Sequence, residues 1–155
     1  MTLARLLRAL TRLRRLQPQV GRLHAAILRA ARGRLRRSVV LAGGQPVLAL
    51  TTTGRNSARP RSTTVAYVRH GDAYAIAALN LGSDRHPAWC LNLRSDPRAH
   101  IHVDGRRVTV TAREAQGDEA EALWEAFIDR LPATANSRAL ARRDVPMFVL
   151  EPEQA

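Results

Sequence analysis

The spacing of apolar residues changes near residue 38, and this change constrains the fold more than any other feature of the sequence. Before it, leucines recur at spacings of three and four from Leu3 to Leu16, which is typical of an amphipathic helix with arginines on its other face. After it, short apolar runs alternate with turn residues, as in strands. We therefore expect a basic amphipathic helical extension over residues 1–37 and a β domain over residues 38–152.

The β domain is expected to contain six to seven short strands. Turn residues separate run 39–41 from 46–50 at Gly43–Gly44, run 63–68 from 73–78 at His70–Gly71–Asp72, and run 100–103 from 107–112 at Asp104–Gly105. A last run covers residues 147–150, and helices are expected at residues 87–94 and 118–131. The pattern predicts a mainly β fold, a small β-barrel with helical insertions.

Charge is distributed unevenly along the chain. There are 25 basic residues, all of them arginine, against 13 acidic ones, which gives a net charge of +12. Fifteen of the arginines lie in the first 71 residues, where no acidic residue occurs. This half predicts a polyanionic partner: anionic lipid, nucleic acid or a phosphorylated cofactor. Nucleic acid is the weakest of the three, because aromatic residues make up only 4% of the chain and no nucleic-acid motif is present.

Cys90 is the only cysteine, which excludes an intramolecular disulfide and a cysteine-based zinc site. His100 and His102 lack further metal-ligating residues at suitable spacing, so no metal is expected. No apolar run is long enough to span a bilayer, and the N-terminus lacks the apolar core of a signal peptide. The expected location is the cytoplasm.

Residues 50–61 pass from an apolar run through three threonines to Gly54 and then present Arg55, Arg59 and Arg61. Guanidinium groups bind phosphate through two parallel N–H bonds, and the backbone N–H groups of a turn add to the attraction. The segment therefore predicts an anion-binding loop, with an exposed hairpin loop bearing solvated arginines as the competing interpretation.

A second polar turn, residues 80–86, leads into a helix that begins near Pro87 and carries Trp89 in its first turn. A helix N-terminus beside such a turn favours an anion or a ring carbonyl, and Trp89 offers a surface for a planar ligand. The alternative is that Trp89 and Leu93 belong to the core, and Cys90 is interpreted as a packed thiol. Because the usual nucleophile, dinucleotide and P-loop motifs are absent, no residue is assigned a catalytic role, and any chemistry would belong to a bound cofactor.

Taken together, these motifs resemble those of the deazaflavin-dependent nitroreductase family. The similarity lies in T-T-G-R-N-S-A-R-P-R at residues 52–61, H-P-A-W-C-L-N-L at residues 86–93 and D-V-P-M-F-V-L-E-P at residues 144–152. It covers roughly residues 45–152 without large gaps. The resemblance implies a split β-barrel of the flavin-reductase and pyridoxamine-oxidase type. It also implies an oxidoreductase that passes a hydride from reduced coenzyme F420, a deazaflavin with a phosphate and a polyglutamate tail, to a quinone, a nitroaromatic or a similar acceptor.

The family's binding residues map onto three segments of this chain. The phosphate and the start of the acidic tail would be held by Arg55, Asn56, Ser57 and Arg61. The deazaflavin would be lined by Ser62, Thr63, Thr64, Val65, Ala66, Ala77, Ala78, Leu79 and Asn80. The ring or ribityl chain would be covered by Ala88, Trp89, Cys90, Leu91 and Asn92.

The chain departs from the family at several of these positions. Asn56 replaces a common lysine, Ala58 replaces a common glycine, and residues 131–137 lack the tyrosines that border the substrate pocket in many members. The acceptor pocket would instead be bordered by Ala66, Thr134 and Ser137. A non-catalytic protein on the same barrel, binding F420, FMN, haem or lipid, therefore remains an alternative to the enzyme.

The resemblance also bears on partners. A leading helix docks near the membrane in some family members, so residues 1–37 are expected either to contact the anionic inner face of the cell membrane or to pack on protein. Such barrels usually bury their open side against a second copy, which implies a homodimer. A basic nucleic-acid-binding module is the least favoured reading.

Overall fold

The structure is a computed structural model that describes residues 37–38 and 45–153. The predicted helical extension over residues 1–36, the predicted strand at residues 39–41 and the Gly43–Gly44 turn lie outside the described residues. Arg37, which the prediction placed in the extension, pairs instead with Pro46 in the two-residue strand β1 (Arg37–Ser38).

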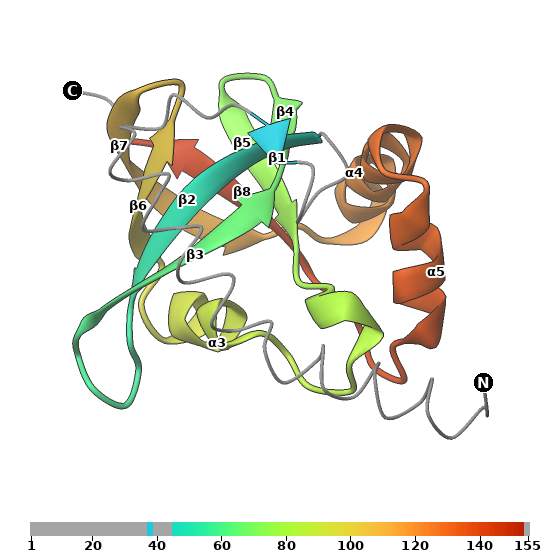
Figure 1. The fold of residues 1–155 in the computed structure, drawn as a ribbon, viewed down its shortest axis with the longest axis horizontal. Coiled ribbons are helices and arrows are strands. Elements are labelled where there is room, and N and C mark those ends of the chain that lie inside the picture. The colour runs from blue at the N-terminus through green and yellow to red at the C-terminus, as the bar shows by residue number, and fades with distance from the viewer. Residues whose placement is uncertain (1–36, 39–44, 154–155) are drawn as a thin grey trace, which may run out of the picture.

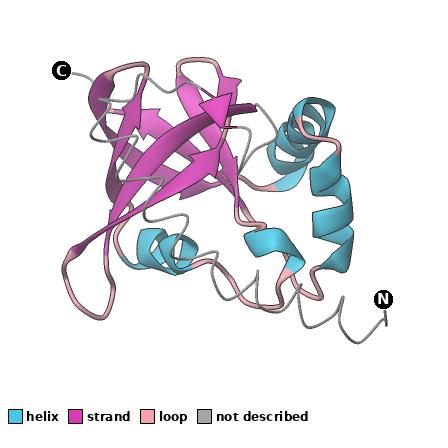
Figure 2. Ribbon diagram, viewed as in Figure 1, coloured by secondary structure: helices cyan, strands magenta, loops and turns pink. Residues whose placement is uncertain are grey.

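Antiparallel strands make up most of the described chain and form one curled sheet (Figure 2). Neighbouring strands follow the order β1-β2-β6-β7-β8-β5-β4, and β3 also pairs with β2. The longer strands are β2 (Gln45–Thr53), β3 (Pro60–Ala66), β6 (Arg98–Val103), β7 (Arg106–Glu114) and β8 (Met147–Pro152), and the shorter ones are β4 (Val68–His70) and β5 (Ala73–Ala77). This architecture confirms the predicted class, an open β-barrel with helical insertions.

The described helices are the 3-10 turn η1 (Asn80–Gly82), α3 (Ala88–Ser95), α4 (Gly117–Arg130) and α5 (Ala133–Leu140). In Figure 1, α3 lies at the end of the barrel next to the loop that joins β2 to β3, whereas α4 and α5 lie together along one side. No helix in this part of the chain is long and apolar enough to cross a bilayer.

Turn chemistry fixes the strand ends, and one strand departs from expectation. Asp104 and Gly105 both have positive φ, 51° and 79°, as the predicted type I′ turn between β6 and β7 requires. The predicted strand at residues 63–68 is wrong in its bounds, because the chain breaks at Tyr67, whose N–H donates to the Pro46 carbonyl at 3.2 Å. The hairpin at Gly71 therefore joins β4 to β5, and β3 is a separate strand.

Two apolar clusters share β5 and β8 as a common wall. Tyr74 and Ile76 of β5 and Phe148 and Leu150 of β8 face the barrel interior, which Cys90 and Leu93 of α3 close at one end. The alternate residues of both strands face α4 and pack on Leu123, Trp124 and Phe127. Because side chains alternate between the two faces of a strand, β5 and β8 contribute residues both to the barrel interior and to the cluster that packs on α4.

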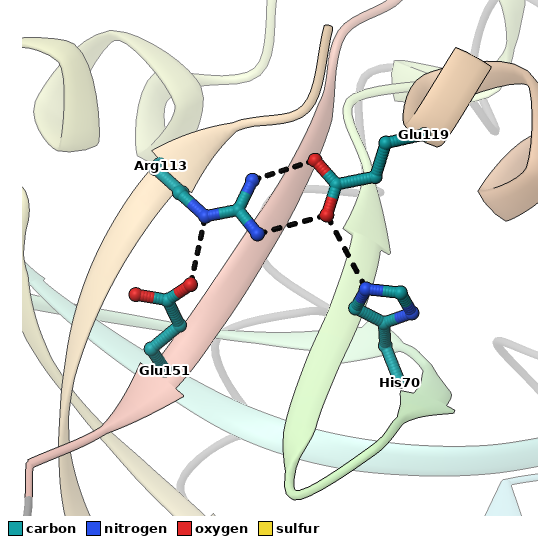
Figure 3. Close-up of polar contacts among 4 residues, drawn as sticks. All are labelled: His70, Arg113, Glu119 and Glu151. Carbon is teal, nitrogen blue, oxygen red and sulfur yellow. Dashed lines mark hydrogen bonds and ion pairs between the residues drawn. The ribbon is translucent and has the colours of Figure 1, made fainter.

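A charged network fastens α4 to the sheet (Figure 3). The Arg113 guanidinium of β7 donates to both Glu119 carboxylate oxygens at 2.7 and 2.8 Å and to Glu151 of β8 at 2.7 Å. His70 Nε2 lies 3.3 Å from Glu119, at the start of α4. The network joins three strands to the first turn of the helix, where acidic side chains are favoured.

Candidate functional site

A tight loop, Gly54–Arg59, follows β2 at the end of the barrel beside α3 (Figure 1). The Gly54 N–H donates to the Arg59 carbonyl at 2.8 Å, and the Gly54 carbonyl accepts from the Ser57 and Ala58 N–H groups at 3.1 and 2.7 Å. A Cβ at Gly54 would lie 2.7 Å from Ser57 Oγ and 3.1 Å from the Arg59 carbonyl oxygen. Glycine is therefore required here by space, whereas Ala58 accepts a φ of 52° that favours glycine.

Basic side chains surround this loop without acidic partners. Arg61 Nη2 donates to Ser57 Oγ at 3.2 Å, which places the Arg61 guanidinium beside the loop. Arg55, Asn56, Ser57 and Arg59 are exposed, and no carboxylate of the described residues forms an ion pair with Arg55, Arg59 or Arg61. Three uncompensated guanidiniums around one turn favour a multiply charged anion.

The side-chain amide of Asn92, on α3, holds the Gly54–Arg59 loop in place. Its Oδ1 accepts from the Arg55 backbone N–H at 3.1 Å, and its Nδ2 donates to Thr52 Oγ1 at 2.9 Å. Asn92 and Thr52 are both buried, with relative exposures of 5% and 2%. The sequence predicted that Asn92 would cover the ligand, but the structure shows both ends of its amide engaged in holding α3 to β2 and the loop.

The predicted lining residues of β3 divide between two faces, because side chains alternate along a strand. Arg61, Thr63 and Val65 share the face of the interior residues Leu48 and Leu50. Ser62, Thr64 and Ala66 share the other face, where Ser62 Oγ lies 2.7 Å from Thr51 Oγ1. The Thr64 hydroxyl oxygen on this face is buried and has no hydrogen-bond partner among the described residues.

The face that carries Thr64 and Ala66 continues onto β5. Ala77 and Leu79 pack with Ala66 against the α4 cluster, whereas Ala78 is fully buried in the barrel interior. The structure thus brings Ala66, Ala77 and Leu79 together and directs the Ala78 side chain away from them. Asn80 has a φ of 44° and donates from Nδ2 to the Arg85 carbonyl at 2.8 Å, which stabilises the turn that follows.

Predicted residues on α3 likewise differ in what they expose. Ala88 is exposed and Leu91 half-buried, whereas half-buried Trp89 packs edge-on against Phe148 with ring centroids 5.7 Å apart. Cys90 is fully buried in the barrel interior, and burial raises the pKa of its thiol to about 11. This agrees with its interpretation as a packed thiol, so among the predicted residues of α3 the accessible side chains are those of Ala88, Trp89 and Leu91.

Residues 133–137 form the first part of α5 (Ala133–Leu140), a helix that the sequence analysis missed. Thr134 is buried, and its hydroxyl donates to the Leu131 carbonyl at 2.6 Å, which ties the first turn of α5 to the end of α4. Ser137 lies on the same helix beside η1, since a Cβ at Gly82 would come within 3.0 Å of the Ser137 carbonyl oxygen. The sequence analysis also missed Arg143, which follows α5 and donates to the carbonyls of Ala78, Leu79 and Ser83.

The β4–β5 and β6–β7 turns lie at the end of the barrel opposite the Gly54–Arg59 loop (Figure 1). A surface cavity of about 590 Å³ is lined by residues of these two hairpins and of the C-terminal segment. Its lining residues are Arg69, Asp72, Tyr74, Arg106, Arg107, Val108, Thr109, Pro152 and Glu153. None of them belongs to the predicted site. The candidate site is therefore defined by side-chain chemistry at the α3 end and not by this cavity.

Comparison with known proteins points to one family. A family model described as F420H(2)-dependent quinone reductase matches residues 20–152. A relative from Mycobacterium tuberculosis, described as an F420H(2)-dependent quinone reductase, is 36% identical over 136 residues, which is 85% of this chain and 89% of the relative.

Solved structures show the same fold. An F420-H2 dependent reductase superposes with a TM-score of 0.63 at 29% identity, covering 68% of this chain and 94% of that chain. A structure described as a domain-swapped dimer has a TM-score of 0.64 at 29% identity, covering 68% and 80%. A haem-binding protein from Mycobacterium smegmatis, at 24% identity and a TM-score of 0.54, covers 79% of this chain and 51% of that chain and shows the fold alone.

Proposed function

The chain belongs to the F420H(2)-dependent quinone reductase family, and we propose that it transfers a hydride from reduced coenzyme F420 to a quinone. The observation that carries the proposal is the Gly54–Arg59 loop, around which Arg55, Arg59 and Arg61 have no carboxylate partner among the described residues. An acidic cofactor tail is the ligand that such a loop favours.

The residues present fit this cofactor. Arg55, Ser57 and Arg61 supply guanidinium and hydroxyl donors for a phosphate and for glutamate carboxylates, with the exposed amide of Asn56 in place of a cation. The buried Thr64 hydroxyl lacks a partner among the described residues, as expected of a group that a ligand completes. When bound, reduced F420 supplies the hydride.

The protein's own contribution is binding and orientation. Asn92 holds the loop backbone at Arg55, so the arginine side chains start from a fixed position. Ala66, Ala77 and Leu79 provide an apolar surface that excludes water from a planar ligand. Trp89, held by Phe148, limits the site on the α3 side.

For the acceptor, we propose a quinone in preference to a nitroaromatic. Residues 131–137 carry no aromatic side chain, and the Thr134 hydroxyl is engaged by the Leu131 carbonyl at the end of α4. The proposed acceptor site, bordered by Ala66 and Ser137, therefore has no aromatic side chain from residues 131–137 on which a nitro-substituted ring could stack. A non-catalytic F420-binding protein is the second candidate, and the same missing aromatic side chains favour it.

We propose the inner face of the cell membrane as the location, supported by the arginine-faced pattern of residues 1–37. Cosedimentation with vesicles of phosphatidylglycerol, but not with phosphatidylcholine vesicles, is expected for the intact chain and should be lost in R5Q/R8Q/R12Q. Equal sedimentation with both would contradict the membrane contact.

The proposed assembly is a homodimer, supported by the domain-swapped dimer among its structural neighbours and testable by light scattering.

The central experiment compares two double variants that remove the same charge. R55A/R61A should weaken F420 binding by about 100–10,000-fold, because two charge-assisted hydrogen bonds of about 1.5–3 kcal/mol each are lost. R106A/R107A removes two exposed arginines at the far end of the barrel and should leave binding nearly unchanged. Equal losses in both variants would mean that net charge, and not this loop, binds the cofactor. Tight binding by the intact protein without turnover of any quinone would favour the non-catalytic alternative.

A further inference from the structure

Arg143 lies in the connection between α5 and β8, and each of its N–H groups has an acceptor. Nε donates to the Ser83 carbonyl at 2.9 Å, and Nη2 donates to the carbonyls of Ala78 at 2.8 Å and Leu79 at 3.2 Å. Nη1 donates to the Asp144 carbonyl at 2.9 Å and to His86 Nδ1 at 3.1 Å. A guanidinium has five N–H donors, so this set uses all of them, and every acceptor is neutral.

The segment held by Arg143 runs from the end of β5 to the start of α3. It contains η1 and follows directly on β5. Predicted cofactor residues therefore lie at both of its ends, at the end of β5 and at the start of α3. Two further observations place the segment against residues 140–142. The Arg142 N–H donates to Asp84 Oδ1 at 3.3 Å. The backbone at Gly82 also lies so close to α5 that an added Cβ would be 2.9 Å from the Leu140 Cβ. The segment is thus fastened to residues 137–144, with Arg143 making most of its polar contacts.

We propose that Arg143 is a positioning residue for the cofactor site: its guanidinium fixes residues 78–86, and with them the His86 ring, relative to α3. The proposal rests on the proposed function for the identity of the ligand. Because Arg143 donates to Nδ1, the neutral His86 ring carries its proton on Nε2, and this Nε2–H remains as a fixed donor at the entrance of α3.

The charges around His86 are consistent with a neutral ring. Burial, together with Arg143 and Arg94, lowers the pKa of His86 below its ordinary value, and Asp144 and Glu114 oppose this shift. The two carboxylates do not reverse the direction. A neutral ring can accept from Arg143, whereas a protonated ring would lose that hydrogen bond and repel the guanidinium.

The variant R143K distinguishes the effect of the positive charge at this position from the effect of the guanidinium's hydrogen-bonding geometry. An ammonium keeps the positive charge but offers three donors from a single atom, so it cannot reach acceptors on both sides of the segment. Arg142 supplies a matched control, because it is the adjacent arginine, its side chain is exposed, and only its backbone N–H contacts the segment.

The experiment compares the wild type, R143K, R143Q and R142K in three ways. Nitrogen NMR reports the His86 tautomer and pKa, amide hydrogen exchange reports the Gly82 and Ser83 N–H bonds to Leu79 and Asn80, and titration reports F420 affinity. In R143K we expect exchange of the two amides to accelerate at least tenfold and the Kd for F420 to rise about tenfold. In R143Q, which also removes the positive charge, we expect the His86 pKa to rise. R142K should match the wild type in all three.

Each outcome bears on the proposal. A wild-type His86 protonated on Nδ1 in its neutral form would overturn it without any variant, so a failure of R143Q to fold does not remove the test. Unchanged exchange and His86 signals in R143K would overturn it as well. If exchange accelerates while F420 affinity stays at the wild-type value, Arg143 is structural only and its role in the site is refuted. Absence of F420 binding by the wild type would instead refute the proposed function, while tautomer and exchange would still decide whether Arg143 holds the segment.

Discussion

At the scale of single residues, the site depends on side chains that hold backbone in place as much as on those that face a ligand. Asn92 is buried and uses its whole amide to connect Thr52, the Arg55 N–H and α3. Thr52 and Asn92 are buried, and an unpaired buried polar group is costly. The shape of the Gly54–Arg59 loop is therefore set from inside the barrel.

Replacing Asn92 should reveal this dependence. N92L keeps the approximate volume but leaves the Arg55 N–H and the Thr52 hydroxyl unpaired, so we expect the free energy of unfolding to fall by about 1–3 kcal/mol and F420 affinity to fall with it. T52V is the matched control: it breaks the hydrogen bond to Nδ2 but keeps the one to Arg55, so stability should fall while affinity is retained. Urea unfolding and fluorescence titration measure both quantities. Unaltered affinity in N92L would show that the loop keeps its shape without Asn92.

The Cys90 thiol should be almost inert in the folded protein. Its pKa of about 11, against an ordinary 9.0, lowers the thiolate fraction at pH 8 by about 100-fold, and complete burial slows access further. Iodoacetamide labelling followed by mass spectrometry should therefore be at least 100-fold slower in buffer than in 6 M urea. Labelling at similar rates in both would mean that α3 opens readily from the end of the barrel.

At the scale of elements, the predictable parts are those with a local signal. The Asp104–Gly105 turn, α3 and α4 follow from glycine, proline and apolar spacing, and they lie within about a residue of their expected ends. The buried face of α4 is formed by Leu123, Trp124 and Phe127.

The parts that could not be predicted depend on distant contacts. Helix α5 has no clear apolar repeat, its Leu140 is 69% exposed, and it is held by η1 and the segment around Arg143. The break at Tyr67 depends on a hydrogen bond to Pro46, 21 residues earlier. Likewise, the two faces of β3 follow from its register with β2, which fixes Thr63 opposite Leu50. The chemistry of the loop remains a prediction from the sequence, and the residues that hold the loop in place became clear only from the structure.

The ion network at the start of α4 predicts a pH dependence of stability. Hydrogen bonds from Arg113, with a smaller contribution from His70, lower the pKa of Glu119 below its ordinary 4.5. A carboxyl with a lowered folded-state pKa stabilises the protein above the unfolded-state pKa, and this stabilisation is lost as the pH falls through the folded-state value. Because Glu119 is about a third exposed, we expect its pairing to contribute only about 0.5–1 kcal/mol.

Substituting Glu119 tests this sign. The difference in free energy of unfolding between the wild type and E119Q, from urea titrations, should be largest at pH 7 and shrink toward zero near pH 3. E125Q removes an exposed carboxylate of the same helix that has no ion pair among the described residues, so its difference should stay nearly constant. A difference for E119Q that grows as the pH falls would reverse the assigned role of the network.

At the scale of the whole molecule, the barrel and the helical layer are not separate units. Strands β5 and β8 place alternate residues in the barrel interior and in the α4 cluster, so both clusters depend on the position of the same two strands. The candidate site lies at the α3 end of this shared structure, and Arg143 connects it to α5 on the helical side. Stability and site geometry are thus coupled through two strands.

This coupling predicts that the two clusters unfold together, and the two tryptophans of the chain report them separately. Trp89 packs against Phe148 at the end of the barrel, whereas Trp124 packs against Phe127 under α4. W124F and W89F therefore leave a single probe in each cluster. We expect the fluorescence-detected urea transition of each variant to coincide with that variant's own transition followed by circular dichroism, because a single cooperative unit gives coincident transitions. An earlier fluorescence transition for Trp124 alone would mean that α4 separates from an intact barrel, and β5 and β8 would then retain their inner contacts without their outer ones.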